Sequence, residues 1–506
     1  MKKRSITSNY LYNLIYQLLI LLIPLITIPY LTRVLGATEL GIYSYTYSIA
    51  TIFFLTSALG INTYGQREIA YVQQDKLKVT KIFWELIIIR SFATIGSLII
   101  LYGFSFLTSR YSLYYQIFGL YVFGNLFDIT WFYQGIEDFK AVAIRNIIVK
   151  VFYLISIFVF IKTRNDLWKY ILLFSLSTLV TNVSFWLNIK KLVNIPSLSS
   201  LNIKKHLKPV LLLFVPQIAS LLYTVLDKTM IGIIVPDIRQ VNYYEQASYI
   251  DKTVLILITT IGTVMASRMA TAFSKKDTTL MREYMFEIVN FVWLLGSALM
   301  FGVAAVIKNV VPWFYGPEYY DVINLVYIMS PLIIIIGFNN VLGVQYLVPT
   351  KKQNKYIFAI VCGSVLNIVL NLILLNVIGT IGAAISSVIA EFVILMIELS
   401  YVKNIITFKD LVKIGLKYLT FGLVMFVIVY YSGFLFMPTI YGTILQVVIG
   451  FIIYACLLLI TKDSFINKHV LPFLKNRRFW CHYYFLFTKI LLRDIIFFNW
   501  MVVVSV

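Results

Sequence analysis

The sequence predicts an all-α, polytopic membrane protein. Of its 506 residues, 60% are hydrophobic and only 13% are charged, whereas soluble domains have roughly 45–50% apolar and about 25% charged residues. Apolar runs of about 17–25 residues recur along the whole chain, and each could cross a hydrocarbon core about 30 Å thick as a helix. Barrel strands would be shorter, about 10 residues, and would alternate strictly. Helices are therefore predicted as the spanning elements.

The apolar runs predict about fourteen spans, although the stretches 82–134 and 355–400 could be divided differently. The predicted spans are 10–31, 41–61, 82–107, 112–134, 145–161, 168–189, 207–235, 247–270, 288–308, 321–345, 355–377, 379–400, 412–433 and 439–461. The first run is longer than the core of a signal peptide, about 7–15 residues, and lacks a small-residue cleavage site. We therefore expect it to be the first span.

A short basic loop, 190–206, divides the predicted spans into two sets of six. An even number of spans in each half predicts parallel repeats, related by an axis along the membrane normal. The expected organisation is an N-terminal lobe (1–191, spans 1–6), a C-terminal lobe (207–400, spans 7–12), a final helix pair (412–461) and a basic tail (462–506). Charges interrupt the apolar run of the tail, so we expect it to be amphipathic and to lie on the cytoplasmic face.

The net charge of +21 is unevenly distributed between alternate loops. One set of loops is rich in lysine and arginine, as in 190–208, and the loops between them carry far fewer. The positive-inside rule then places both termini in the cytoplasm. The basic excess is explained by topology and by attraction to anionic membrane lipids, so nucleic acid is not expected as a partner.

No sequence motif indicates an enzyme. The chain has no GK[ST] phosphate loop, no HExxH and no GxSxG, and its three cysteines have no metal-binding spacing. We therefore expect a transporter without catalytic residues, metal ligands or a bound cofactor. A proton or sodium gradient is the candidate energy source.

Ionisable residues inside the predicted spans are the most informative feature. A charge at the bilayer centre costs at least about 2.5–3.5 kcal/mol, and such residues usually face a polar cavity or pair with one another. Arg90 and Asp128 lie at similar depth in neighbouring spans and are predicted to pair. The remaining ionisable residues are Asp227, Lys228, Asp251, Lys252, Glu391 and Glu398, with Arg33 and Arg268 near span ends. For any one residue an internal ion pair is an equal explanation, but the whole set predicts a polar cavity between the halves.

Asp227 and Lys228 are adjacent, so on a helix they point about 100° apart. One of them is expected to face the cavity and the other a neighbouring helix. Cations on the wall suit a phosphate or pyrophosphate. The many tyrosines suit sugars, although an interfacial aromatic belt explains most of them. The polar residues expected to extend the lining are Asn13, Gln17, Asn339, Asn340, Asn367 and Asn371.

Several segments resemble a known family. PLITIPYLTRVLGATELGIYSY (24–45) and GINTYGQREIA (60–70) resemble the N-terminus of the polysaccharide-biosynthesis flippases of the Wzx type, in the multidrug/oligosaccharidyl-lipid/polysaccharide exporter superfamily. Later landmarks follow in the same order: LDKTMIG (226–232), FYGPEY (314–319), GVQYLVPTKKQNKY (343–356) and IGAAISSVIAE (381–391).

The resemblance implies fourteen helices, arranged as two six-helix lobes in a V with a final helix pair. It implies transfer of undecaprenyl-pyrophosphate-linked oligosaccharide across the bacterial cell membrane by alternating access, for capsule or exopolysaccharide assembly. The polysaccharide polymerase and chain-length machinery are candidate partners. By this resemblance, the cavity cations that hold substrate would be Arg33, Arg90, Lys228 and Arg268. The candidates for ion coupling or internal pairing are Asp128, Asp227, Asp251 and Glu391.

Two other functions stay open at this point. A multidrug or cation antiporter of the same superfamily would be expected to have an acid-dominated cavity. A membrane polysaccharide polymerase or lipid-dependent glycosyltransferase would be expected to carry a large external loop. The longest external loops predicted here are short, 236–246 and 309–320 among them, and this favours the flippase.

Overall fold

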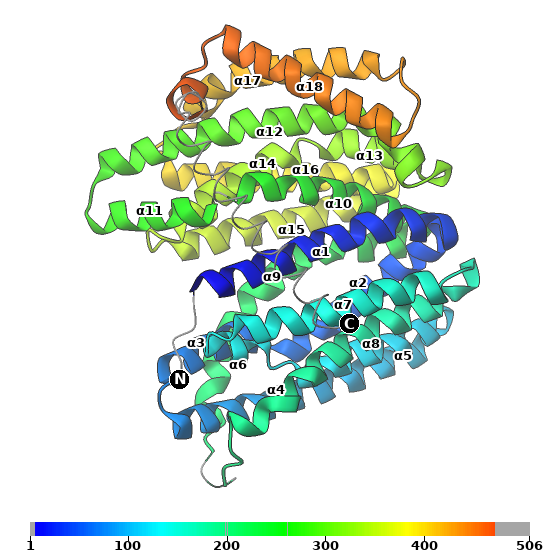
Figure 1. Cartoon of the computed structure of the whole chain (residues 1–506), viewed down its shortest axis with the longest axis vertical. Helices are drawn as coiled ribbons and strands as arrows, with labels where there is room; N and C mark the ends of the chain where they lie inside the picture. Colours follow the sequence, from blue (N-terminus) through cyan, green and yellow to red (C-terminus); the bar gives the residue numbers. More distant parts are fainter. Residues whose placement is uncertain (1–5, 198, 200, 261, 471–506) are drawn as a thin grey trace, which may run out of the picture.

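The computed structural model describes residues 6–197, 199, 201–260 and 262–470, and these residues form helices joined by short turns (Figure 1). The helices of the first half are α1 (Ile6–Val34), α2 (Gly36–Ala58), α3 (Ile61–Val72), α4 (Lys76–Leu107), α5 (Ser112–Gly124), α6 (Thr130–Gly135), α7 (Phe139–Phe160) and α8 (Leu167–Ser184). Short 3-10 turns accompany them: η1 (Ser109–Tyr111), η2 (Asn125–Phe127), η3 (Arg164–Asp166) and η4 (Phe185–Lys191).

The second half continues with α9 (Lys204–Ile234), α10 (Arg239–Thr259), α11 (Gly262–Ser274), α12 (Thr278–Phe314), α13 (Asp321–Met329), α14 (Leu332–Asn339), α15 (Gln353–Ile378), α16 (Thr380–Val402), α17 (Phe408–Ser432) and α18 (Ile440–Ile460). Three shorter helices complete it: η6 (Pro317–Tyr319), η7 (Asn340–Leu347) and η8 (Ile466–Val470), of which η7 and η8 are π-helical. The predicted amphipathic tail lies, beyond residue 470, outside the described residues.

Local chemistry explains where several helices begin. The Asp75 carboxylate accepts hydrogen bonds from the backbone amides of Leu77 and Lys78 at the start of α4, and Thr407 and Asp410 form a capping box at the start of α17. These side chains satisfy amide groups that have no partner within the helix. Gly36, with φ of 78°, allows the sharp turn between α1 and α2.

The surface of the helices is suited to lipid. By length and composition, nine of the described helices could cross a membrane, or ten if the bent pair Asp321–Met329 and Leu332–Leu347 counts as one span. Large apolar side chains such as Phe106, Leu107 and Phe451 are exposed, and continuous apolar surface of this kind is rare on soluble proteins. The chain is an all-α, polytopic membrane protein.

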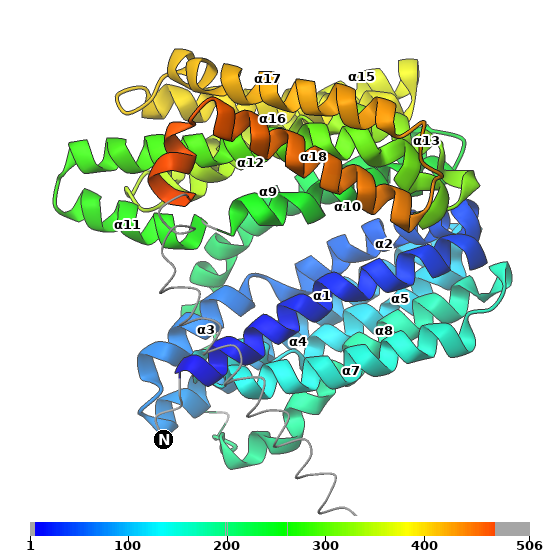
Figure 2. The same ribbon diagram turned by 45° about the horizontal axis from the view of Figure 1, so that its top comes forward.

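The helices form two groups, α1–α8 and α9–α18 (Figure 2). Within the first group α5 packs on α8 and α4, and within the second α15 packs on α16 and α12 on α17. The groups are joined chiefly through α2, which contacts both α9 and α10. This junction positions the site described next.

Candidate functional site: a polar hollow between the two helix groups

An open hollow of about 1250 Å³ lies between α1, α2, α7 and α8 of the first group and α10 of the second. Aromatic hydroxyls dominate its polar wall: Tyr43, Tyr47, Tyr153, Tyr170 and Tyr249. Two charged residues, Lys150 and Glu245, also line it. A wall of this kind offers ring faces, hydroxyl groups that both donate and accept hydrogen bonds, and one ammonium group.

Lys228 reaches the edge of this hollow. Its ammonium group forms an ion pair with Glu245 at 2.9 Å and lies 5.8 Å from the ring centre of Tyr47. Both of these partners line the hollow. Lys228 is therefore the member of the Asp227–Lys228 pair that faces the cavity, and its charge there is balanced by Glu245.

Lys150, on α7, was missed by the sequence reasoning. Its ammonium group lies 5.6 Å from the ring centre of Tyr153, and no carboxylate among the described residues forms an ion pair with it. Lys150 is a charged residue inside the apolar run 145–161. The other ionisable residues were identified by this same feature, and it would have identified Lys150 as well. Glu245 was missed because only the folded chain shows that it meets Lys228.

Asp227 faces away from the hollow, into the second helix group. Its carboxylate accepts hydrogen bonds from Tyr244 and Asn371, each at 2.5 Å, and from Ser387 at 2.9 Å. Asn367 in turn accepts a hydrogen bond from Asn371 at 3.2 Å. The two asparagines, expected from the sequence to extend the central lining, thus belong to this buried network.

A second, smaller pocket adjoins the Asp227 network. It is lined by Asp227, Ser248, Asp251 and Lys252, with apolar residues of α13 and α14. Asp251 is 5% exposed, and neither of its carboxylate oxygens has a hydrogen-bond partner within the described structure. Two carboxylates and the Lys252 ammonium group thus border one small pocket, and ionisable groups gathered in this way inside a membrane protein mark ion or proton sites.

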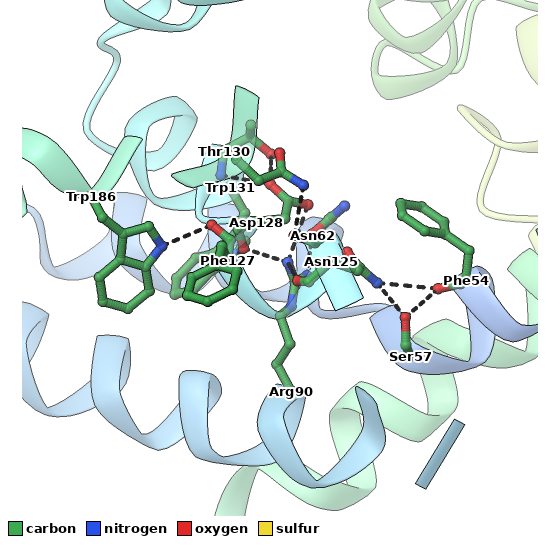
Figure 3. Close-up of polar contacts among 12 residues, drawn as sticks. Phe54, Ser57, Asn62, Arg90, Asn125, Phe127, Asp128, Thr130, Trp131 and Trp186 are labelled. Carbon is green, nitrogen blue, oxygen red and sulfur yellow. Dashed lines mark hydrogen bonds and ion pairs between the residues drawn. The ribbon is translucent and has the colours of Figure 1, made fainter. Parts of the chain in front are cut away.

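Arg90 lies away from both pockets, in a dry polar cluster of the first group (Figure 3). It forms an ion pair with Asp128 at 3.1 Å, as its depth in the sequence predicts. Its guanidinium also donates to the backbone carbonyls of Asn125 and Asp128 and to the side chain of Asn62. These carbonyls are at the break between α5 and α6, where the helix cannot satisfy them. Arg90 therefore completes a broken helix and does not line the hollow.

The other residues singled out from the sequence are dispersed. Arg268 is exposed on α11 and is not part of the lining of the hollow. Glu391, on α16, is buried and accepts a hydrogen bond from the side chain of Asn339. Arg33 is exposed at the end of α1, where it donates to the carbonyls of Trp313 and Phe314 in the last turn of α12. A cation at the C-terminal end of a helix is favoured by the helix dipole.

Arg33 belongs to a set of contacts that join the two groups at one end of the hollow. Arg164 and Glu318 form an ion pair at 2.7 Å, and Glu318 also accepts a hydrogen bond from the amide of Ala37 at 3.1 Å. Deeper in the interface, Ser48 and Thr229 are joined by a hydrogen bond of 2.8 Å. The hollow is closed at this end by direct contact between the groups.

Gly41 permits a close approach of the two backbones within this closed end. A Cβ atom at Gly41 would lie only 2.3 Å from the carbonyl oxygen of Ile238. Gly41→Ala is therefore expected to separate the groups here, although alanine favours the helix itself by about 1 kcal/mol. Spin labels at Leu113 and Tyr320, exposed on opposite groups, should report a longer distance.

The matched control is Gly96→Ala, because a Cβ at Gly96 meets no atom within 4 Å. It should leave the label distance unchanged. An equally unchanged distance in Gly41→Ala would show that the contact at Ile238 does not set the spacing of the groups.

The protein is a membrane-embedded helical bundle with a polar hollow between two helix groups, and this is the architecture of a membrane transporter. Within this class, the sequence profile of the family described as "Polysaccharide biosynthesis protein" matches residues 6–273, more than half of the chain. The chain belongs to this family, and it is a membrane transporter for polysaccharide biosynthesis.

Two relatives have been described as O-antigen transporters. The one from Escherichia coli (strain K12) is 24% identical over 414 residues, covering 79% of this chain and 98% of the relative. The one from Shigella dysenteriae is 23% identical over 391 residues, covering 76% and 96%.

Solved structures show the same fold. The lipid II flippase MurJ in an inward closed conformation is similar with a TM-score of 0.71 at 17% identity, over 90% of this chain and 99% of that one. An inward-facing multidrug transporter of the MATE family gives a TM-score of 0.62 at 15% identity, over 80% and 96%. At these identities the likeness establishes a MurJ/MATE-like fold and carries no substrate assignment.

Proposed function

We propose that the protein is a flippase that moves undecaprenyl-pyrophosphate-linked oligosaccharide across the cytoplasmic membrane by alternating access. The observation that carries the proposal is the tyrosine-rich hollow between the helix groups, where the ammonium group of Lys150 forms no ion pair with a described residue. Tyrosine hydroxyls hydrogen-bond to sugar hydroxyls, and an ammonium group pairs with a phosphate. The O-antigen transporter relatives support a substrate of this class.

The proposal includes fourteen crossings in two six-helix lobes, 1–191 and 207–400, with a final pair at 412–461. Beyond the ten apolar spans that result when the bent pair is counted as one, four further crossings would be α1, α5 with α6, α9, and α10 with α11. Among these, α5 and α6 are separated by a break at Asp128, and α9 and α10 carry the polar residues Asp227 and Glu245. An even number of crossings, with the basic loops inside, would place both termini in the cytoplasm. The closed end of the hollow would then face outward.

The direct test of substrate is deletion of the gene in its host. Deletion should lower surface polysaccharide and leave lipid-linked oligosaccharide on the cytoplasmic leaflet, and the wild-type gene should restore both. Greater drug sensitivity with normal polysaccharide would instead indicate an antiporter. Shortened polymer with normal transfer of single repeat units would indicate a polymerase. Either of these results would contradict the flippase.

The pocket that Asp227 and Asp251 line is the proposed site of the coupling ion, a proton or Na⁺. Asp251→Asn should leave the fold intact, because neither carboxylate oxygen of Asp251 accepts a hydrogen bond from a described residue. It should lower gradient-driven transport by about 5- to 150-fold, the usual range for coupled sites. Transport is measured in vesicles with and without an imposed gradient.

The matched control for this variant is Glu283→Gln, which neutralises an exposed carboxylate on α12. It should leave transport unchanged. If vesicles that contain the Asp251→Asn variant respond to the gradient as wild-type vesicles do, the coupling ion binds elsewhere.

A further inference from the structure

A second buried acidic site lies on α16, away from the Asp227 pocket. Glu391 and Glu398 are two helical turns apart and are 6% and 0% exposed. Glu391 accepts a hydrogen bond from Asn339, but neither oxygen of the Glu398 carboxyl has a hydrogen-bond partner among the described residues. Glu398 is therefore a fully buried acid that the transport mechanism proposed above does not use.

A glycine makes space beside the Glu398 carboxyl, and the titratable groups that face this carboxyl do not neutralise it. η7 presents Gly343, where a Cβ would lie 2.8 Å from Glu398 Oε1 and 2.4 Å from a ring carbon of Tyr356. The titratable groups that face Glu398 are Tyr356 on α15 and Glu391 on α16, and neither is a cation. η7 is a π-helical segment of eight residues, and π-helical segments occur frequently at functional sites.

Two acceptor atoms on the neighbouring segments α14 and η7 also lack donors among the described residues. Asn339 Oδ1 and Gln345 Oε1 are also buried without a hydrogen-bond partner in the described part of the chain. An isolated carboxylate in such an interior would cost tens of kcal/mol by a simple Born estimate, so the group is neutralised instead. A proton on Glu398 would remove the charge and supply the hydrogen-bond donor that the site lacks.

One face of α16 connects this site to the Asp227 pocket. Ser387, which donates to Asp227 at 2.9 Å, precedes Glu391 by one turn, and Glu398 follows two turns later. The three side chains span about 16 Å along the helix. Glu398 lies near the end of α16 that packs with Met265 and Leu347, whereas the residues of α16 before Ser387 pack with Ala37 and Tyr319 at the closed end.

We propose that Glu398 is a proton-binding site and that its proton exchanges at the end of the molecule opposite the closed contact. We further propose that this proton reaches the Asp227 pocket along the face formed by Glu398, Glu391 and Ser387. The second part rests on the proposed function, because it assigns the proton to coupled transport. Proton binding by Glu398 does not depend on the substrate.

Infrared difference spectra of the purified full-length protein in lipid bilayers test the site. Between acidic and alkaline media, the wild type should show the C=O stretching band of a protonated carboxyl. Glu398→Gln should remove the Glu398 component of this band, and the exposed control Glu283→Gln should retain it. If Glu398→Gln does not accumulate, Glu398→Asp must shift the band. A band unaltered by substitution of Glu398, or removed by Na⁺ at constant pH, would overturn the proposal.

Surface polysaccharide in cells tests the path separately. Glu398→Gln is expected to lower polymer by at least 5-fold at wild-type protein abundance. Loss of the Glu398 component of the infrared band with normal polymer would overturn the path to Asp227. Failure of the flippase assignment itself would appear differently, as normal polymer after deletion of the whole gene.

Discussion

Replacing Arg90 by alanine is expected to remove most of the folded protein from the membrane. The substitution leaves Asp128 as a buried unpaired charge and deprives the carbonyls at the α5–α6 break of their donor. Breaking a buried ion pair by removing one partner costs about 3–5 kcal/mol, a large part of the total stability of most proteins. The measurement is the amount and melting temperature of detergent-extracted protein.

Asp128→Asn added to Arg90→Ala is the informative second variant. It removes the unpaired charge while keeping a polar side chain at the break, so it should recover part of the lost stability. Wild-type abundance and melting temperature in Arg90→Ala alone would show that Arg90 does not hold the broken helix together.

Replacing Lys150 by methionine is expected to lower transport strongly while preserving the fold. Methionine keeps most of the aliphatic length but removes the charge, and Lys150 has no described ion-pair partner to be left unpaired. A hydrogen bond between an ammonium group and a phosphate contributes about 1.5–3 kcal/mol, so transport should fall about 10- to 100-fold. The measurement is surface polysaccharide at matched protein abundance.

Two variants control for this effect. Lys140→Met makes the same change at an exposed position of α7 and should leave polysaccharide unchanged, and Lys150→Arg keeps the charge and should retain most of it. Equal losses in Lys140→Met and Lys150→Met would trace the defect to helix α7 as a whole and not to the hollow.

The helical membrane fold could be predicted because long apolar runs leave a chain few alternatives in lipid. The interruptions were harder to predict. The run 112–134 contains the break at Asp128, and the run 321–345 contains a bend and the π-helix η7. The break at Asp128 depends on a tertiary partner, Arg90, which supplies hydrogen bonds to the freed backbone groups.

The candidate site was predictable to the extent that charges in apolar sequence must find partners. Depth alone predicted the pairing of Arg90 with Asp128, and helical geometry predicted different faces, about 100° apart, for Asp227 and Lys228. Arg90 was also expected in the cavity, but it lies in a dry cluster because the broken helix beside it needs a donor. The sequence offers no local signal for such a need, nor for the contact between Lys228 and Glu245.

The most direct test of the central claim is transfer of lipid-linked oligosaccharide between leaflets in vesicles that contain the purified protein. The hollow between the helix groups predicts transfer well above that of protein-free vesicles, reduced about 10- to 100-fold by Lys150→Met and unaffected by Lys140→Met. Wild-type transfer no faster than in protein-free vesicles, or equally fast in Lys150→Met, would contradict it.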